Sequence, residues 1–300
     1  MTHPAAPEPT TPQSSPSEWL TDSNGQIALS IRFQGKPLFQ EKSPYQTVEV
    51  FDTYSCGKML TIDSMVMCTE WDEAAYHEMI AQVPMLTHPG VQDVLVIGAG
   101  DGGTIREILR HDHVQKITMV EIDEAVIRAS QQFLPGIASA FNNPKLDLRV
   151  DDGIKFVENA TAESYDLIVI DSSDPVGPSE GLFTKSFYEG VFRALRPGGV
   201  VTVQSESPSF NPKAFTELNL CLKAVFGSDS VHCYLLHIPT YPTGMWSLTY
   251  CAKQGPHPLK DFDYAKAEQF TEAHCMRYYN ADVHQAAFCL PTYVRKMING

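Results

Sequence analysis

Short apolar segments alternate with helical segments between residues 93 and 204, and few folds accommodate this alternation. Segments with the length and composition of buried strands lie at 93–97, 116–121, 146–150, 166–170 and 199–204. Helical segments lie at about 104–111, 124–133 and 186–195. Parallel strands need long, usually helical, connections. The pattern therefore predicts an α/β fold with a Rossmann-like, doubly wound, mainly parallel sheet, similar to that of methyltransferases.

Different patterns flank this region. Residues 1–17 carry five prolines among Ala, Ser and Thr, which predicts a disordered tail. Residues 18–70 contain short β-rich runs broken by glycine and proline, which predicts a small antiparallel β domain. The catalytic domain is expected over 71–300. It would begin with a helix over about 72–85 and include a helix over 213–226 and closing antiparallel strands at 231–238 and 245–252.

Composition excludes several classes of function. The formal charge of -14 argues against a broad basic surface for nucleic acid. The seven cysteines form no CxxC pair, which is typical of reduced thiols in a cytoplasmic protein. The sequence shows neither an apolar stretch of about 20 residues nor an apolar leader, so we expect no membrane association.

A glycine-rich loop follows the first strand of the alternating region. Gly98-Ala99-Gly100-Asp101-Gly102-Gly103 places an acid where related loops approach a phosphate. Glycines let the backbone come close to a nucleotide-like ligand, but Asp101 would repel a pyrophosphate. The loop therefore favours a nucleoside that carries positive charge over NAD. Ala99 is tolerable in such a loop if its φ angle is negative.

Acidic residues follow the next three strands. Glu121 ends the second strand, at the spacing where an acid binds ribose hydroxyls. Asp152 and Gly153 follow the third, where a carboxylate can accept a hydrogen bond from an exocyclic amine such as that of adenine. Asp171 and Asp174 follow the fourth. Each acid alone could cap a helix, but the ordered set predicts an adenosine-type site.

The segment 171–178 reads DSSDPVGP and cannot be helical, because it contains two prolines and a glycine. It could be a capped turn or a loop that presents two carboxylates to amines, and its position beside the nucleoside site favours the loop. Tyr76, His77 and Tyr241 could supply aromatic walls and hydrogen bonds. His111 and His113 have no third ligand of suitable spacing, so we expect them to be solvated rather than bound to a metal.

Together these motifs resemble the spermidine synthases, the polyamine aminopropyltransferases. The resemblance covers residue 19 to near the C-terminus. It rests on motifs in the same order, at 98–103, 120–123 (VEID), 151–153 (DDG), 171–178, 239–241 (PTY), 277–280 (RYYN) and 284–288 (HQAAF).

The resemblance implies transfer of an aminopropyl group from decarboxylated S-adenosylmethionine to putrescine, giving spermidine and methylthioadenosine. The donor carries an amine and a sulfonium, in keeping with the acidic loop. The residues implied to bind the donor are Gln46, Asp101, Glu121, Asp152, Gly153 and Pro178. Gln46 and Asp101 would contact the aminopropyl or thioadenosine end. Glu121 would contact the ribose, and Asp152 with Gly153 the adenine.

A further set is implied to bind the acceptor: Tyr76, His77, Asp101, Asp171, Ser172, Ser173, Asp174, Gln204 and Tyr241. Sulfonium is already a good leaving group, so no metal or other cofactor is expected. The acceptor amine has a pKa of about 10.4, and deprotonating it at neutral pH costs about 4–5 kcal/mol. Asp171 is predicted to orient the amine and accept its proton, assisted by Tyr76 and Tyr241.

Other functions are also compatible with these motifs. A methyltransferase that uses S-adenosylmethionine would share the sheet and Glu121, but its donor carboxylate would meet Asp101, Asp171 and Asp174. A polyamine-binding scaffold without activity is a second alternative. The acceptor could also be spermidine, cadaverine or agmatine. The N-terminal β domain implies, again by resemblance, a homodimer or homotetramer.

Overall fold

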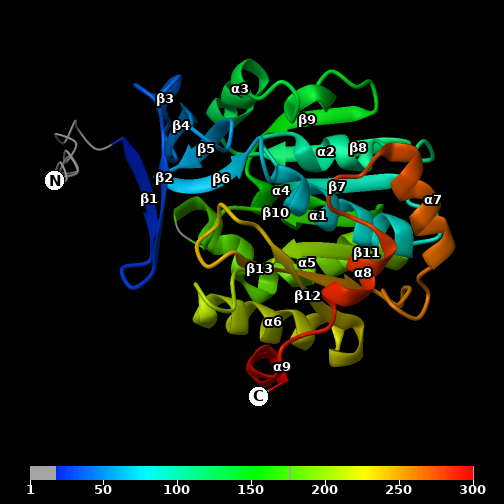
Figure 1. The fold of residues 1–300 in the computed structure, drawn as a ribbon. Helices are drawn as coiled ribbons and strands as arrows, with labels where there is room; N and C mark the ends of the chain where they lie inside the picture. The colour runs from blue at the N-terminus through cyan, green and yellow to red at the C-terminus, as the bar shows by residue number, and fades with distance from the viewer. Residues whose placement is uncertain (1–17, 176, 300) are drawn as a thin grey trace, which may run out of the picture.

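The computed structural model describes residues 18–175 and 177–299, without the side chain of Pro178. The predicted N-terminal tail, 1–17, lies outside these residues. Two small antiparallel sheets come first, a hairpin of β1 and β2 and a four-stranded sheet β3-β4-β5-β6. Figure 1 shows them in blue tones on one side of the large sheet. Their strands are β1 (Trp19–Ser23), β2 (Ala28–Arg32), β3 (Phe39–Lys42), β4 (Thr47–Asp52), β5 (Lys58–Ile62) and β6 (Met65–Thr69).

The large sheet has the order β12-β13-β11-β10-β7-β8-β9. Strands β7 to β11 are parallel, and β13 pairs antiparallel with both β11 and β12. This confirms the predicted mainly parallel, Rossmann-like sheet and its antiparallel closing strands. The strands are β7 (Asp93–Gly98), β8 (Lys116–Glu121), β9 (Leu146–Val150), β10 (Tyr165–Asp171), β11 (Leu195–Gln204), β12 (Val231–His237) and β13 (Met245–Ala252).

Helices cover both faces of this sheet (Figure 1). Side chains of β7 alternate between two apolar cores: Val94 and Val96 pack with α1, α2, α7 and α8, while Leu95 and Ile97 pack with α4, α5 and α6. The helices are α1 (Glu73–Thr87), α2 (Gly103–Ile108), α3 (Glu124–Phe133), α4 (Gly153–Asn159), α5 (Lys185–Ala194), α6 (Pro212–Phe226), α7 (Tyr264–His274), α8 (Ala281–Ala287) and α9 (Thr292–Asn299). Short 3₁₀ turns lie at Ala138–Ala140, Gly177–Phe183 and Ser228–Ser230.

The structure differs from the sequence-based expectation in two segments that connect elements of the large sheet. Helix α4 was not predicted, because its seven residues are too few to show a clear helical period. The segment 196–199 (RPGG), which joins the helix predicted over 186–195 to the strand predicted over 199–204, is part of β11. The register between β10 and β11 shifts there, and Gly198 has a φ of 88°, so the segment is accommodated as a bulge.

The prediction that His111 is solvated is wrong. Its ring is buried, stacks on Phe270 at a centroid distance of 4.3 Å, and its Nε2 lies 2.7 Å from Oε1 of Gln82. Burial and the nearby charge of His113 lower the pKa of His111 to about 3, so the neutral ring donates from Nε2 to Gln82. His113 is exposed. His111 is therefore a structural side chain between α2 and α7.

Candidate active site

A cavity opens at the carboxyl ends of β7, β8, β10 and β11, with β5 and β6 forming part of its wall. This is where ligands bind in doubly wound sheets. The predicted site residues that line it are Gln46, Tyr76, Asp101, Glu121, Asp152, Gly153, Asp171, Ser172, Ser173, Asp174, Gln204 and Tyr241. The predicted role of Pro178 concerns a side chain outside what the structure describes.

The glycine loop runs directly against the end of β10. Gly98 has a φ of 86°, and a Cβ atom added to it would lie 2.0 Å from the backbone oxygen of Asp171. The backbone N–H of Ala99 donates to the same oxygen at 3.0 Å. This close approach places Asp101 and Asp171, from two different strand ends, on one cavity wall.

Ala99 departs from the expectation of a negative φ, because its φ is 64°. The left-handed conformation costs an L-residue about 1–2 kcal/mol in the folded protein, and glycine avoids this cost. Glycine also gives the unfolded chain more conformational entropy, which lowers the free energy of unfolding by about 0.4–1 kcal/mol. We therefore expect Ala99→Gly to raise the free energy of unfolding by up to about 1 kcal/mol, measured by thermal unfolding. Ala286→Gly, at an exposed helical position in α8, is the matched control and should destabilise the protein. A lower melting temperature for Ala99→Gly would contradict the strain.

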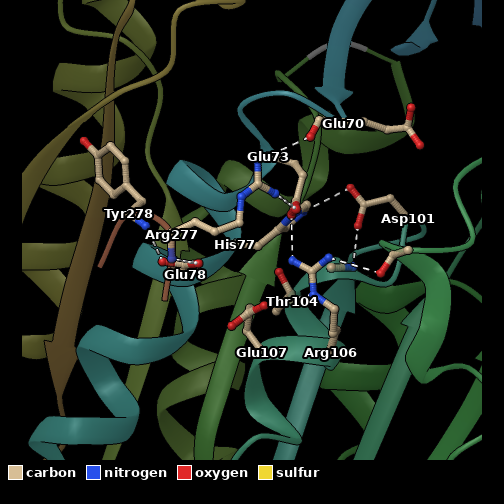
Figure 2. Close-up of polar contacts among 12 residues, drawn as sticks. Glu70, Glu73, His77, Glu78, Asp101, Thr104, Arg106, Glu107, Arg277 and Tyr278 are labelled. Carbon is tan, nitrogen blue, oxygen red and sulfur yellow. Dashed lines mark hydrogen bonds and ion pairs between the residues drawn. The ribbon is translucent and has the colours of Figure 1, made fainter. Parts of the chain in front are cut away.

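Asp101 is held by two donors, one for each carboxylate oxygen. The backbone N–H of Gly103 donates to Oδ1 at 2.8 Å, and Nε2 of His77 lies 3.2 Å from Oδ2 (Figure 2). Burial alone would raise the pKa of Asp101, but the charge and hydrogen bond of His77 and the N–H of Gly103 lower it. Asp101 is therefore an ionised, oriented carboxylate in the cavity wall.

Asp171 is also fixed through both oxygens. The hydroxyl of Tyr76 donates to Oδ1 and that of Thr104 donates to Oδ2, each at 2.6 Å. Burial and the negative charge of Asp101 raise the pKa of Asp171. A carboxylate with a raised pKa is a better proton acceptor than an ordinary aspartate. Thr104 was missed by the sequence reasoning, although it follows the glycine loop by one residue.

Glu121 is a buried carboxyl beside the glycine loop. Its Oε1 accepts a hydrogen bond from the backbone N–H of Asp123 at 2.9 Å. Its Oε2 packs close to Gly100, because a Cβ atom added to Gly100 would lie only 2.9 Å from it. Burial, with smaller contributions from the charges of Asp123 and Asp171, raises the pKa of Glu121 to about 7. The side chain of Asp123 caps α3 and accepts a hydrogen bond from Ser43, which ties this part of the site to the N-terminal sheets.

Asp152 and Gly153 begin α4 and also line the cavity. Oδ1 of Asp152 accepts the N–H groups of Ile154 and Lys155, so Asp152 is the N-cap of α4. A Cβ on Gly153 would lie 2.6 Å from Cγ2 of Ile97, which explains the need for glycine there.

A second group of carboxyls surrounds Asp174. Asn211 donates to Oδ2 of Asp174 at 3.1 Å and to Oε2 of Glu206 at 2.7 Å, and Gln204 donates to Oε1 of Glu206 at 3.1 Å. Burial and the charge of Asp22 raise the pKa of Asp174 to about 6, and burial and the charge of Asp174 raise that of Glu206 to about 8. Sequence reasoning missed Glu206, although it follows β11 by two residues. It also missed Asp22, which lies on β1, far from any strand-end motif.

The remaining predicted acceptor residues occupy different positions. The ring of Tyr241 lies between those of Tyr76 and Trp246, and its hydroxyl donates to the backbone oxygen of Met67. Ser173 shares a hydrogen bond of 2.7 Å with Ser179, while the buried hydroxyl of Ser172 has no partner among the described residues.

His77 does not line the cavity. Both of its ring nitrogens are occupied by Glu73 and Asp101, so the structure places it behind the cavity wall. The predicted direct contact of His77 with the amine is therefore corrected to a contact with Asp101.

Within 18–175 and 177–299, no group of three His, Cys, Asp or Glu side chains is placed to hold a metal ion. Among the helices of the same residues, none has the length and apolar character needed to span a bilayer.

Comparisons with known proteins agree with this geometry. A family described as "Spermine/spermidine synthase domain" matches residues 73–264, and one described as "Spermidine synthase tetramerisation domain" matches residues 19–70. The chain belongs to the spermine/spermidine synthase family. It is thus a member of a family of aminopropyltransferases, as the motifs predicted.

Curated relatives and solved structures support membership of this family. The chain is 43% identical to a polyamine aminopropyltransferase of Bacillus subtilis over 93% of its own length and 98% of the relative's. It is 40% identical to a spermidine synthase of Solanum lycopersicum, over 88% and 78% of the two chains. A spermidine synthase solved with the transition-state analogue AdoDATO has a TM-score of 0.89 and 35% identity, covering 95% and 96%. The spermidine synthase of Thermotoga maritima gives 0.88 and 34% over the same shares.

Proposed function

We propose that this protein transfers the aminopropyl group of decarboxylated S-adenosylmethionine to putrescine. The observation that carries this proposal is Asp171, a half-buried carboxyl with a raised pKa that is oriented by Tyr76 and Thr104 beside Asp101. Glu121 would bind the ribose hydroxyls, and Asp152 with Gly153 the adenine. Gln46 and Asp101 would contact the aminopropyl end.

The reaction is a direct displacement. The lone pair of the acceptor nitrogen attacks the methylene carbon next to the sulfonium, and the carbon–sulfur bond breaks with its electron pair left on sulfur. Before it attacks, the acceptor nitrogen, an ammonium at neutral pH, gives one proton to Asp171, and the product amine keeps its remaining protons and a positive charge. The displacement forms no covalent intermediate with the protein, and positive charge leaves the sulfur as the bond forms. The protein contributes orientation and proton acceptance, and we propose that it needs no metal or organic cofactor.

The second amine of putrescine would lie near the group formed by Asp22, Asp174 and Glu206. A cation there would favour the ionised forms of carboxyls whose pKa values are about 6 and about 8 in the free protein. Gln204 and Ser172 offer further polar contacts along the wall. We propose that each of the two acidic regions holds one amine of a diamine acceptor.

The test is product formation. The protein is incubated with decarboxylated S-adenosylmethionine and, separately, putrescine, cadaverine, agmatine or spermidine, and methylthioadenosine and the new polyamine are quantified. We expect the highest kcat/KM with putrescine, unchanged by a strong chelator. Methylation of an acceptor by S-adenosylmethionine would instead support a methyltransferase. Polyamine binding without any product would support a binding protein.

Assembly and location are further parts of this proposal. We propose that residues 18–70 form a separate β domain that joins copies of the chain into a homodimer or homotetramer, and that 71–300 form the catalytic domain in the cytoplasm. The match to a tetramerisation domain at 19–70 supports this division. Light scattering of the purified protein measures the number of copies.

The pKa of Glu121 makes donor binding depend on pH. A carboxyl with a pKa of about 7 is about half protonated at neutral pH, and ribose hydroxyls bind its ionised form better. We therefore expect donor affinity to rise by about tenfold between pH 6 and pH 8, with about half a proton released on binding at pH 7. Calorimetry in buffers of different ionisation enthalpy measures this release.

Glu121→Gln should lose most of the proton release, whereas Glu124→Gln, at an exposed position on α3, should keep it. Proton uptake on binding to the unmodified protein would contradict the role of Glu121.

A further inference from the structure

A network of charged side chains connects the C-terminal part of the chain to Asp101 (Figure 2). Glu73, at the start of α1, is its centre. Oε2 of Glu73 lies 2.7 Å from Nδ1 of His77 and 2.7 Å from a guanidinium nitrogen of Arg106, and Oε1 lies 3.0 Å from Nη1 of Arg277. Burial alone would raise the pKa of Glu73, but His77 and Arg106 lower it to about 2. Glu73 is thus a buried carboxylate with three cationic partners.

His77 links Glu73 to Asp101, which lines the cavity. Burial alone would lower its pKa, but Asp101 and Glu73 raise it well above its usual value, so the ring is an imidazolium that donates to both carboxylates. A Cβ added to Gly103 would lie 2.3 Å from Cε1 of the ring. Because the backbone of Gly103 packs against the ring, His77 has little room to turn, and a shift of Glu73 would move the ring and Asp101 together.

Arg277 reaches Glu73 from a segment that is itself anchored. The backbone N–H groups of Arg277, Tyr278 and Tyr279 all donate to the buried carboxylate of Glu78, at 2.7–2.9 Å. The guanidinium of Arg277 also donates to the backbone oxygen of Trp71 at 2.8 Å. Figure 2 shows Arg277 and Tyr278 against α1 at these acids. Although the Arg277 side chain is half exposed, its backbone is fixed on the helix that carries Glu73 and His77.

We propose that Arg277 is a positioning residue for Asp101, acting through Glu73 and His77, and that it thereby strengthens binding of the donor's primary ammonium group. This inference rests on the proposed function, in which Asp101 contacts the aminopropyl end of the donor. Arg277 holds one oxygen of Glu73 so that the other points at His77. Without Arg277, Glu73 keeps Arg106 and His77 on Oε2 but loses the partner of Oε1, so the His77 ring, and through it Oδ2 of Asp101, is held less firmly.

The test compares two ligands that differ at the end that Asp101 would bind. Methylthioadenosine has the nucleoside of the decarboxylated donor but lacks the aminopropyl group, so only the donor senses Asp101. We expect Arg277→Gln to raise the Kd of the donor by about 3- to 10-fold, an effect of the size of one weakened charge-assisted contact, with the Kd of methylthioadenosine within about twofold. Arg277→Lys should recover part of the loss. Arg295→Gln, at an exposed position in α9, is the matched control and should change neither constant.

A double-mutant cycle tests whether His77 lies on the path. In a His77→Gln background, Arg277→Gln should change the donor Kd by less than about twofold, because its effect requires the imidazolium. Thermal unfolding shows that each variant is folded. Equal weakening of both ligands, or full additivity with His77→Gln, overturns the inference while the proposed function stands. Failure of the unmodified protein to bind the donor overturns the proposed function, and the inference with it.

Discussion

Replacing Asp171 by asparagine is expected to lower kcat by about 10²- to 10⁴-fold, the range for loss of a positioned proton acceptor. The amide has nearly the same shape, but its NH₂ group cannot accept a hydrogen bond, so either Tyr76 or Thr104 loses its partner. It also cannot take the proton of the acceptor amine. Initial rates of methylthioadenosine formation at saturating substrates measure the effect.

Donor binding separates this role from general damage to the site. Glu121 and Asp152, the proposed contacts to ribose and adenine, are untouched by the substitution, so the Kd of the donor should change by only a few-fold. Asp282→Asn, on the exposed side of α8, is the control and should have normal kcat. Near-normal turnover of Asp171→Asn would overturn its assignment as proton acceptor.

Gly98→Ala is expected to have the largest effect on the structure of the site. The φ of 86° is unfavourable for alanine, and the new Cβ would lie 2.0 Å from the backbone oxygen of Asp171. Because that atom belongs to a buried central strand, the strand end must move. We expect a loss of about 2–4 kcal/mol in the free energy of unfolding. A displacement of Asp171 by about 1 Å should also lower kcat/KM by about 10²-fold.

The control for Gly98→Ala is Gly25→Ala, which separates the effect of the steric clash from the effect of the unfavourable φ angle. Gly25 has a φ of 83° and nothing within 4 Å of an added Cβ, so Gly25→Ala carries the conformational cost alone. We expect it to lower the melting temperature less than Gly98→Ala and to leave kcat unchanged. Equal losses of stability and unchanged activity in both variants would show that the contact between β7 and β10 does not position Asp171.

Strand ends explain why much of the site could be predicted. Carboxyl ends of parallel strands meet at one edge of the sheet, so Asp101, Glu121, Asp152 and Asp171 converge whatever the details of packing. Glu206 obeys the same rule and was within reach of it. Asp22 was not, because nothing in a short antiparallel hairpin indicates which cavity its side chain will face.

The errors have a common physical origin in tertiary packing. The φ of Ala99 depends on the contact between the loop and the backbone oxygen of Asp171. The burial of His111 depends on Phe270, which is far away in the sequence. His77 was correctly placed on the helix that enters the large sheet, but which atoms its two nitrogens meet is decided by Glu73 and the glycine loop. The Glu73–His77 contact is an i,i+4 pair that the predicted helix implies, but local sequence carries no signal for the other contacts.

The attachment of residues 277–279 to Glu78 has a consequence for synthesis of the chain. Every residue of α1 is buried, yet one of its acids receives its backbone partners from a segment about 200 positions later. Contacts over such separations form late in folding. A ribosome-bound chain that stops short of residue 277 would already contain every described residue that lines the cavity. Its helix α1 would still lack the hydrogen bonds that residues 277–279 donate to Glu78. We therefore expect α1, which forms part of the cavity wall, to reach its final position only after residues 277–279 have been translated.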